Sequence, residues 1–197
     1  MSSVDSPHES GIDWLGEHAS IVAPRLLGSI LHGPNGSGRI VEVEAYGGAD
    51  DPASHGHKGV TERTKTVFGP TGFLYVYLSY GIHSCANVVT GAQDEGHAVL
   101  IRAVEPVEIT PPMAAARPKA RRDVDISNGP GKLCQALGID LSHDGLDLQH
   151  QHSVVRLDRG EPVDESDIVA TTRIGISKAV EKPWRFYVAN NPWVSKR

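Results

Sequence analysis

The eight residues RIVEVEAY (39–46) decide the fold, because their alternating side chains are typical of a β-strand with two different faces. The alternation directs Val41, Val43 and Ala45 to one face, and Ile40, Glu42, Glu44 and Tyr46 to the other. A short apolar run at 26–31 precedes this stretch, and the intervening HGPNGSG is rich in turn-forming residues. We therefore predict a β-hairpin over residues 26–46.

Strand patterns recur along the rest of the chain, at 73–80, 82–89, 97–107, 153–159, 168–176 and 184–188. Helical signals are fewer: 12–22 ahead of Pro24, a small basic segment at 111–125 that forms an exposed helix or loop, and 130–137 with Gly138 as its stop. We predict an α/β (α+β) fold, a single compact domain with a mixed, mostly antiparallel β-sheet and peripheral helices. Residues 1–11 are expected to form a flexible N-terminus, and residues 12–197 the domain.

The composition excludes several classes of protein. The 197 residues fit one globular domain, and no run of about 18 apolar residues is present to cross a membrane. The N-terminus lacks the basic start and apolar core of a secretory signal, and two cysteines make no disulfide framework, so we expect a cytoplasmic protein. The net charge of −5 argues against indiscriminate nucleic-acid binding. Basic clusters at 58–65, 117–122 and 178–182 nevertheless permit one cationic face.

Residues 47–72 form a long stretch of Gly, Asp, His and Thr without periodicity, and a loop of this length in a compact domain is usually functional. It contains His55-x-His57. Two histidines at this spacing can share a metal ion, as in a metal-dependent hydrolase, but a loop histidine can equally serve in hydrogen bonding or stacking.

A second cluster is Glu42-x-Glu44-x-Tyr46, whose members lie on one strand face about 7 Å apart. Paired carboxylates at such a spacing suit a hydrolase, and the alternative is an ordinary solvent-facing stripe. Arg102 lies within an apolar strand segment, where an unpaired charge is costly. Glu44 is therefore a candidate partner for Arg102.

A third cluster, Tyr75-x-Tyr77-x-x-Tyr80-Gly81, holds three of the five tyrosines in the chain. Aromatic rings beside basic segments are suited to stacking on nucleic-acid bases, although a tyrosine-rich strand can also fill the edge of a core. Tyr80 stands at the end of its strand beside a glycine, where a ring is able to project.

Several runs occur in a characteristic order: RIVEVEAY (39–46), ASH (53–55), TERTKTVFGPTGFLYVYLSYG (61–81), NVV (87–89), VLIRAVEP (99–106), NGPGKLCQALGI (128–139), RIGI (173–176) and PWRFYV (183–188). Together they resemble the alkyladenine (3-methyladenine) DNA glycosylase family, over nearly everything from Leu26 to Val194. The resemblance implies a compact α/β domain with an antiparallel sheet. It also implies a monofunctional enzyme that flips a damaged purine out of DNA and hydrolyses its N-glycosidic bond, leaving an abasic site.

The resemblance further implies roles for individual residues. Glu44 is the general base that activates water, and Arg102 helps to hold that water, whereas Glu42 is supporting or structural. Tyr46, His55 and Tyr77 wall the base pocket, where electron-rich rings suit cationic alkylpurines, and Asn87 disfavours the exocyclic amine of guanine. Tyr80 is the intercalating residue of the DNA interface. The expected contacts with the DNA backbone are Thr61, Arg63 and Lys65.

The implied partner is double-stranded DNA containing damaged purines, bound by a monomer without a metal, a cofactor or a membrane. Three positions depart from the family pattern with apolar changes: Val67, Ile82 and Ala86. The small Ala86 is expected to loosen the pocket wall. Two alternatives remain: a metal-dependent hydrolase that uses His55 and His57, and a non-catalytic nucleic-acid-binding module.

Overall fold

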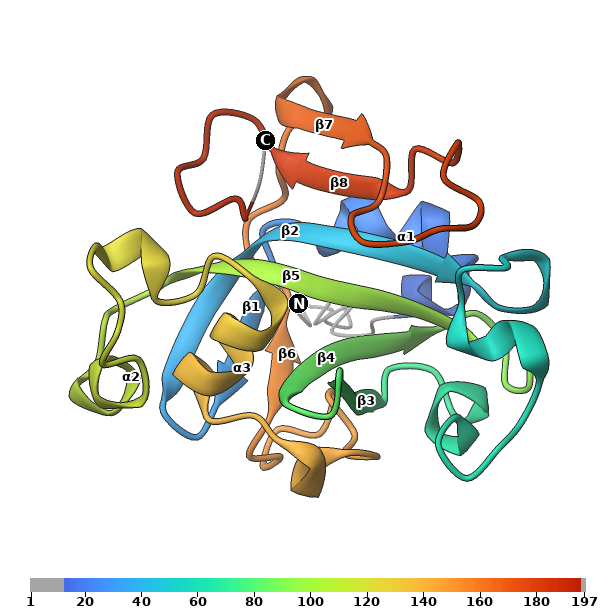
Figure 1. Ribbon diagram of the computed structural model, residues 1–197, viewed down its shortest axis with the longest axis horizontal. Coiled ribbons are helices and arrows are strands. Elements are labelled where there is room, and N and C mark those ends of the chain that lie inside the picture. Colours follow the sequence, from blue (N-terminus) through green and yellow to red (C-terminus); the bar gives the residue numbers. More distant parts are fainter. Residues whose placement is uncertain (1–12, 196–197) are drawn as a thin grey trace, which may run out of the picture.

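The central element of the computed structural model is the strand β2 (Gly36–Gly47), which contains the RIVEVEAY stretch. One edge of β2 pairs with β5 (His97–Pro106), and the other pairs first with β1 (Ile30–Gly33) and then with β8 (Arg185–Val188). Figure 1 shows β2 and β5 crossing the middle of the molecule side by side. The structure describes residues 13–195, so the predicted flexible N-terminus, 1–11, lies outside the described residues.

The curled sheet is antiparallel at every pairing of the described strands, in the order β3-β4-β5-β2-β1-β6. The remaining strands are β3 (Leu74–Ser79), β4 (His83–Thr90), β6 (Arg156–Asp158) and β7 (Ile168–Thr171), and β7 pairs with β8. The predicted hairpin is confirmed, with residues 34 and 35 as the turn between β1 and β2, but its first strand is shorter than predicted, because α1 ends at Leu26 and β1 begins at Ile30. The predicted α+β class and single compact domain are confirmed as well.

The described α-helices lie around this sheet. The helix α1 (Ala19–Leu26) packs on β2 and β5, α3 (Pro130–Leu137) packs on β4 and β5, and α2 (Pro111–Ala116) packs on α3. The predicted bounds of α3 are confirmed, because Gly138 ends it in the left-handed conformation at φ 75°. Side chains from α1, α3 and the sheet share one apolar core. Short 3₁₀ turns complete the fold at Asp13–Gly16 (η1), Asp123–Asp125 (η5), Leu141–His143 (η6) and Glu165–Asp167 (η7).

The first helix differs from the prediction for 12–22. A 3₁₀ turn and α1 replace one continuous helix, and α1 runs through Pro24 to Leu26. Pro24 removes only one hydrogen bond close to the end of the helix. The side chain of Leu26 is fully buried, and its packing stabilises the last turn despite that loss.

The alternation along β2 is interrupted by a bulge. The pairing of β2 with β5 shifts register between Ile40 and Val43, and Ile40 packs in the main core together with Val43, whereas Val41 does not belong to that cluster. The prediction that Ile40 shares a face with Glu42 and Glu44 is therefore wrong, because an extra residue in one strand reverses the faces beyond it.

The strand predicted over 168–176 is also too long, since β7 ends at Thr171. Gly175 has a φ of +76°, and the backbone N–H of Ile174 donates to the carboxylate of Glu44 rather than to a neighbouring strand. Similarly, the segment predicted over 153–159 forms only the short strand β6.

The 47–72 loop contains three 3₁₀ turns, η2 (Gly48–Asp50), η3 (His55–Lys58) and η4 (Lys65–Phe68). A second apolar cluster fastens η4 to the sheet, with Val67 packed among Tyr75, Val89 and Ala98. The loop is consequently held against β3, β4 and β5. None of the helices in residues 13–195 has the length and apolar character needed to cross a membrane.

Candidate active site

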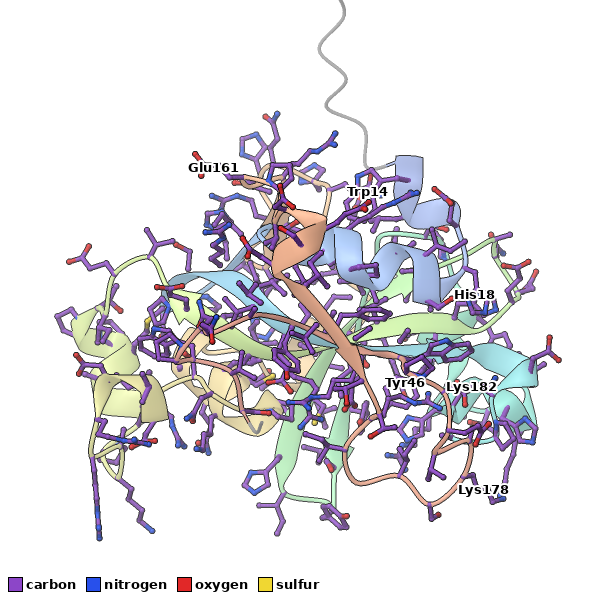
Figure 2. All side chains as sticks on the ribbon, turned by 90° about the horizontal axis from the view of Figure 1, so that it is seen from above. Trp14, His18, Tyr46, Glu161, Lys178 and Lys182 are labelled. Carbon is purple, nitrogen blue, oxygen red and sulfur yellow. The ribbon has the colours of Figure 1, made fainter. Side chains whose placement is uncertain are left out.

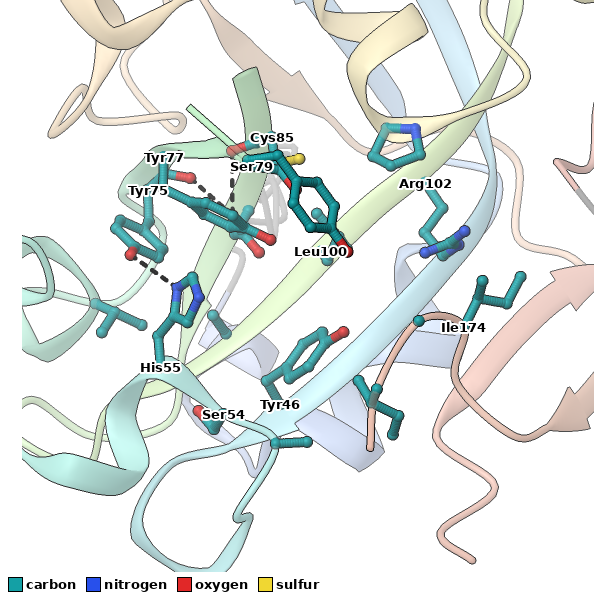
Figure 3. Close-up of a pocket in the computed structure, with 18 residues that line it drawn as sticks. Tyr46, Ser54, His55, Tyr75, Tyr77, Ser79, Cys85, Leu100, Arg102 and Ile174 are labelled. Carbon is teal, nitrogen blue, oxygen red and sulfur yellow. Dashed lines mark hydrogen bonds between the residues drawn. The ribbon is translucent and has the colours of Figure 1, made fainter. Parts of the chain in front are cut away.

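A cavity of about 270 Å³ opens where the end of β2, the 47–72 loop, the β3–β4 hairpin and residues 174–176 meet (Figure 3). Most of the residues singled out in the sequence line it: Tyr46, His55, Tyr77, Tyr80, Asn87 and Arg102. Glu44 lies directly behind this lining, bonded to Tyr46 and Arg102. The predicted DNA-backbone residues Thr61, Arg63 and Lys65 do not line the cavity.

The carboxylate of Glu44 is fully buried and is held from several directions. The hydroxyl of Tyr46 donates to its Oε2 at 2.9 Å, and the backbone N–H of Ile174 donates to its Oε1 at 2.7 Å. Nη1 of Arg102 lies 3.2 Å from the same Oε1. The predicted pairing of Arg102 with Glu44 is confirmed, and the contacts fix the orientation of the carboxylate.

Glu42 is bonded more extensively. Its Oε1 accepts hydrogen bonds from Nε of Arg102 at 2.9 Å, Nε of Arg185 at 2.7 Å and the hydroxyl of Ser195 at 2.9 Å. Its Oε2 accepts the backbone N–H of Ser195 at 2.6 Å. Glu42 is fully buried, so the alternative of a solvent-facing stripe is wrong.

These contacts also set the protonation of the network. Burial alone would raise the pKa of Glu42, but Arg102, Ser195 and Arg185 outweigh burial and hold the pKa below its ordinary value. Burial likewise opposes the charge of Arg102, and the carboxylates of Glu44 and Glu42 outweigh it and raise the pKa of Arg102. Glu42 and Arg102 therefore both stay charged, and they form a buried ion pair in which Arg102 reaches the cavity lining.

Aromatic rings form the cavity wall on the side of the 47–72 loop. The rings of His55 and Tyr77 meet edge to face at 4.5 Å, and those of Tyr75 and Tyr77 lie 5.6 Å apart. Nδ1 of His55 and the hydroxyl of Tyr75 are 3.1 Å apart, as Figure 3 shows. Burial and the nearby Arg63 lower the pKa of His55, so its imidazole is neutral at pH 7. Burial raises the pKa of Tyr75 to about 12.

Asn87 contributes a fixed amide to the cavity. Its Nδ2 donates to the carbonyl oxygens of Tyr75 at 3.0 Å and Cys85 at 3.3 Å, which uses both N–H groups. The amide oxygen is the group that remains for a molecule in the cavity. Because Asn87 is buried and doubly bonded, this oxygen has a defined position.

Tyr80 stands in the turn between β3 and β4 and is 91% exposed. Its φ is +52° and that of Gly81 is +70°, with the N–H of Ile82 donating to the carbonyl oxygen of Ser79. Two successive positive φ values normally call for Asn, Asp or Gly, so a tyrosine is strained here. A strained and almost fully exposed ring at the edge of a cavity is typical of a functional residue.

The three predicted DNA-backbone residues are all exposed. The guanidinium carbon of Arg63 lies 5.5 Å from the centroid of the Tyr77 ring, which places Arg63 next to the cavity wall. Nζ of Lys65 is 3.3 Å from Glu62, and the Thr61 hydroxyl bonds within its own turn. Their roles in DNA contact stay a prediction.

The two histidines of the loop, His55 and His57, do not face a common metal site. His55 faces Tyr75, whereas Nδ1 of His57 lies 2.7 Å from the carbonyl oxygen of Ala49. Over residues 13–195, no group of three or more His, Cys, Asp or Glu side chains is arranged to hold a metal ion. The metal-hydrolase alternative therefore has no assembled ligand set in this part of the chain.

Other residues were missed or misplaced by the sequence patterns. Ala86 packs in the main core rather than in the cavity, so the expectation that it loosens the pocket wall is wrong. Ile174 and the buried ion pair of Arg173 with Asp51 were not singled out. The rule applied to Arg102, that an arginine among apolar residues needs an anionic partner, would have found Arg173 beside Ile174.

The chain belongs to the methylpurine-DNA glycosylase (MPG) family of DNA-repair enzymes, whose sequence profile matches residues 13–192. The resemblance noted in the sequence is thereby confirmed. Several similar proteins carry the name "Putative 3-methyladenine DNA glycosylase". One from Burkholderia lata is 47% identical over 178 residues, covering 90% of this chain and 86% of the relative. Others are from Nocardia farcinica (44% identical; 88% and 84% covered) and Carboxydothermus hydrogenoformans (48% identical; 81% and 82% covered).

Proposed function

We propose that this protein is a monofunctional DNA glycosylase that takes alkylated or deaminated purines out of duplex DNA and hydrolyses their N-glycosidic bonds. The observation that carries the proposal is the position of Glu44: a buried carboxylate, oriented by three groups, directly behind a cavity with aromatic walls. Family membership and the names of the relatives support the same reaction.

In the proposed mechanism, Glu44 accepts a proton from a water molecule held beside Arg102. The water oxygen forms a bond to C1′ of the sugar, the bond from C1′ to the purine breaks, and its electron pair leaves with the base. A cationic purine leaves as a neutral molecule, whereas a neutral purine must gain a proton. The product strand keeps its backbone and carries an abasic sugar.

The walls and the projecting ring have separate tasks in this proposal. Tyr46, His55 and Tyr77 stack on the extruded purine, and the fixed side chain of Asn87 disfavours the exocyclic amine of guanine. Tyr80 enters the duplex and fills the space left by the extruded nucleotide, since stacking on a base is worth about 1–3 kcal/mol.

The partner in this proposal is double-stranded DNA with damaged purines, and the protein acts as a monomer in the cytoplasm, where it meets the nucleoid if the organism is bacterial. Thr61, Arg63 and Lys65 contact phosphates beside the cavity. The exposure of all three supports this assignment.

The test is excision from a lesion-bearing duplex under single-turnover conditions. Wild-type protein releases the damaged purine, and Glu44→Gln still binds the duplex but is slower by about 10²–10⁴-fold. The matched control is Glu105→Gln, a half-buried glutamate on β5 outside the cavity, which keeps the wild-type rate. If the wild-type protein binds the duplex but releases no base, the result favours the non-catalytic nucleic-acid-binding module. If Glu44→Gln excises the base at a near-normal rate, Glu44 is not the general base.

A further inference from the structure

The segment that carries Ile174 is fastened by a buried ion pair between Arg173 and Asp51. Nη1 of Arg173 donates to Oδ2 of Asp51 at 2.5 Å, and Nη2 donates to Oδ1 at 2.8 Å, with both side chains fully buried. Nη1 also donates to the carbonyl oxygen of Ala45 at 2.9 Å, and Nη2 to that of Ala179 at 3.3 Å. Together these contacts hold the guanidinium plane in one orientation.

The same guanidinium contacts two aromatic rings. Its central carbon lies 4.8 Å from the centroid of the Tyr46 ring and 5.3 Å from that of Trp184. Nζ of Lys182 lies 4.1 Å from the Trp184 ring, and Figure 2 shows the labelled Lys182 and Tyr46 in the same half of the molecule. Arg173 is thus a fixed cation in contact with one of the rings that face the cavity.

Tyr46 lines the cavity and Arg173 does not. The Tyr46 ring therefore separates a permanent positive charge from the space in which a purine would stack. An aromatic ring attracts a cation through the electron density of its face. A guanidinium in contact with the ring draws on that density, so the ring attracts a second cation less strongly.

The neighbouring charges limit the range of this effect. Asp51 is hydrogen-bonded to both terminal nitrogens of Arg173. Groups far from this ion pair therefore experience almost no net charge. What remains is a short-range effect on groups that touch the Tyr46 ring. A cationic purine loses attraction there, whereas a neutral purine keeps its stacking and apolar contact.

The opposite wall differs. The guanidinium of Arg63 lies 5.5 Å from the centroid of the Tyr77 ring, but Arg63 is exposed and water screens its charge. Its Nη2 donates to the carbonyl oxygen of Leu78 at 3.4 Å, so Arg63 is held far less firmly than Arg173. Of the two arginines, Arg173 is the one whose influence on the bound base is fixed by the fold.

We propose that Arg173 is a specificity-determining residue that acts through Tyr46: it weakens the preference of the cavity for cationic alkylated purines, so that neutral deaminated purines are also accepted as substrates. This inference rests on the proposed function, because it assumes that the cavity receives the damaged base. According to this inference, the ion pair of Arg173 and Asp51 sets the relative rates at which cationic and neutral damaged purines are removed.

The experiment measures kcat/KM for two duplexes of the same sequence context, one with 7-methylguanine and one with hypoxanthine. The readout is the ratio of the cationic to the neutral substrate within one protein preparation. A merely structural defect lowers both rates and cancels in this ratio. Arg173→Lys keeps the charge, and the double variant Asp51→Asn/Arg173→Met removes the cation without leaving a buried carboxylate unpaired.

We expect Arg173→Lys to keep the ratio within about twofold, and the double variant to raise it by about three- to tenfold, the size expected for one cation–π contact. Asp51→Asn alone leaves the cation without its counter-charge and lowers the ratio. An unchanged ratio in the double variant overturns the inference, as does an equal rise in Arg173→Lys. If the double variant fails to fold, Asp51→Asn decides, because a ratio that stays constant or rises contradicts the proposal. Absence of excision from both duplexes by the wild-type protein would instead refute the proposed function.

Discussion

Glu42 and Glu44 both lie fully buried on β2, with one residue between them, and Arg102 contacts both of them, yet their surroundings differ. Glu42 accepts four hydrogen bonds, two of them from Ser195 and one from Arg185. Glu44 instead adjoins the cavity through Tyr46 and Ile174. The carboxylate of Glu42 is fully occupied by hydrogen bonds that stabilise the fold. The carboxylate of Glu44 lies next to the space where a substrate would lie.

The Glu42 network predicts an acid-sensitive fold. Because the folded protein holds the pKa of Glu42 below 4.5, its contribution to stability is complete above the unfolded-state value and is lost as the pH falls through the lower folded-state value. Glu42→Gln should lower the free energy of unfolding by about 3 kcal/mol at pH 7, since it leaves buried guanidinium groups undercompensated. Urea denaturation from about pH 7 to about pH 3 checks this, and the gap between variant and wild type should narrow towards acid. A constant gap would contradict the assignment.

Tyr80 predicts opposite changes in stability and DNA binding. Tyr80→Asn should raise the free energy of unfolding by about 1 kcal/mol, because Asn tolerates the left-handed conformation that Tyr80 adopts at φ 52°. The same change should weaken binding to lesion DNA by about 1–3 kcal/mol through the loss of stacking. Tyr80→Phe keeps the ring and should bind as the wild type does. Chemical denaturation and fluorescence anisotropy measure the two quantities, and unchanged DNA affinity in Tyr80→Asn would exclude intercalation.

Arg63 predicts a change in the salt dependence of DNA binding. Arg63→Ala should reduce the slope of log K against log salt by about 1, because one phosphate contact and its released counterion are lost. Arg159, an exposed arginine at a different cavity, supplies the control: Arg159→Ala should keep the wild-type slope. Tyr80→Ala should also keep the slope while it lowers affinity. Identical slopes for Arg63→Ala and wild type would show that Arg63 stays on Tyr77 in the complex.

Covalent trapping distinguishes hydrolysis by water from chemistry through an amine. No lysine is among the residues found to line the cavity within 13–195, and Lys58 and Lys65 of the loop are exposed. An amine nucleophile is normally activated by desolvation in an apolar pocket, and these two exposed lysines are not desolvated. Borohydride added during turnover should therefore trap no protein–DNA adduct, and the product strand should stay intact until alkali cuts it. An adduct that disappears in Lys58→Ala or Lys65→Ala would establish a Schiff-base mechanism instead.

Local patterns in the sequence were sufficient for much of the fold. Alternation located β2 and β3, the turn residues between 31 and 39 located the first hairpin, and Pro130 with Gly138 marked the ends of α3. These features depend on residues that are neighbours in the chain, and the physical preferences of such residues act locally.

Most features that depend on distant partners were out of reach, although the rule for a charge in an apolar strand did predict the pairing of Arg102 with Glu44. The bulge after Ile40 leaves no trace in a pattern of period two, and only the pairing with β5 reveals it. The partners of Arg173 and Glu42 come from remote segments, so the sequence patterns did not show which groups they contact. The tyrosines were found because three of the five in the chain cluster at 75–80, and Arg102 because it lies among apolar residues, whereas Ile174 contacts Glu44 through its backbone N–H and has no side-chain signature.

The hydrogen bonds from Ser195 to Glu42 have a consequence for protein synthesis. A ribosome produces the strand that holds both glutamates early and residue 195 much later, so the anchor beneath the cavity cannot close on a growing chain. A nascent or truncated polypeptide that exposes Glu44 and Tyr80 would still lack this anchor. The arrangement makes the completion of the Glu42 network depend on the arrival of a distant serine, because contacts between remote segments form late.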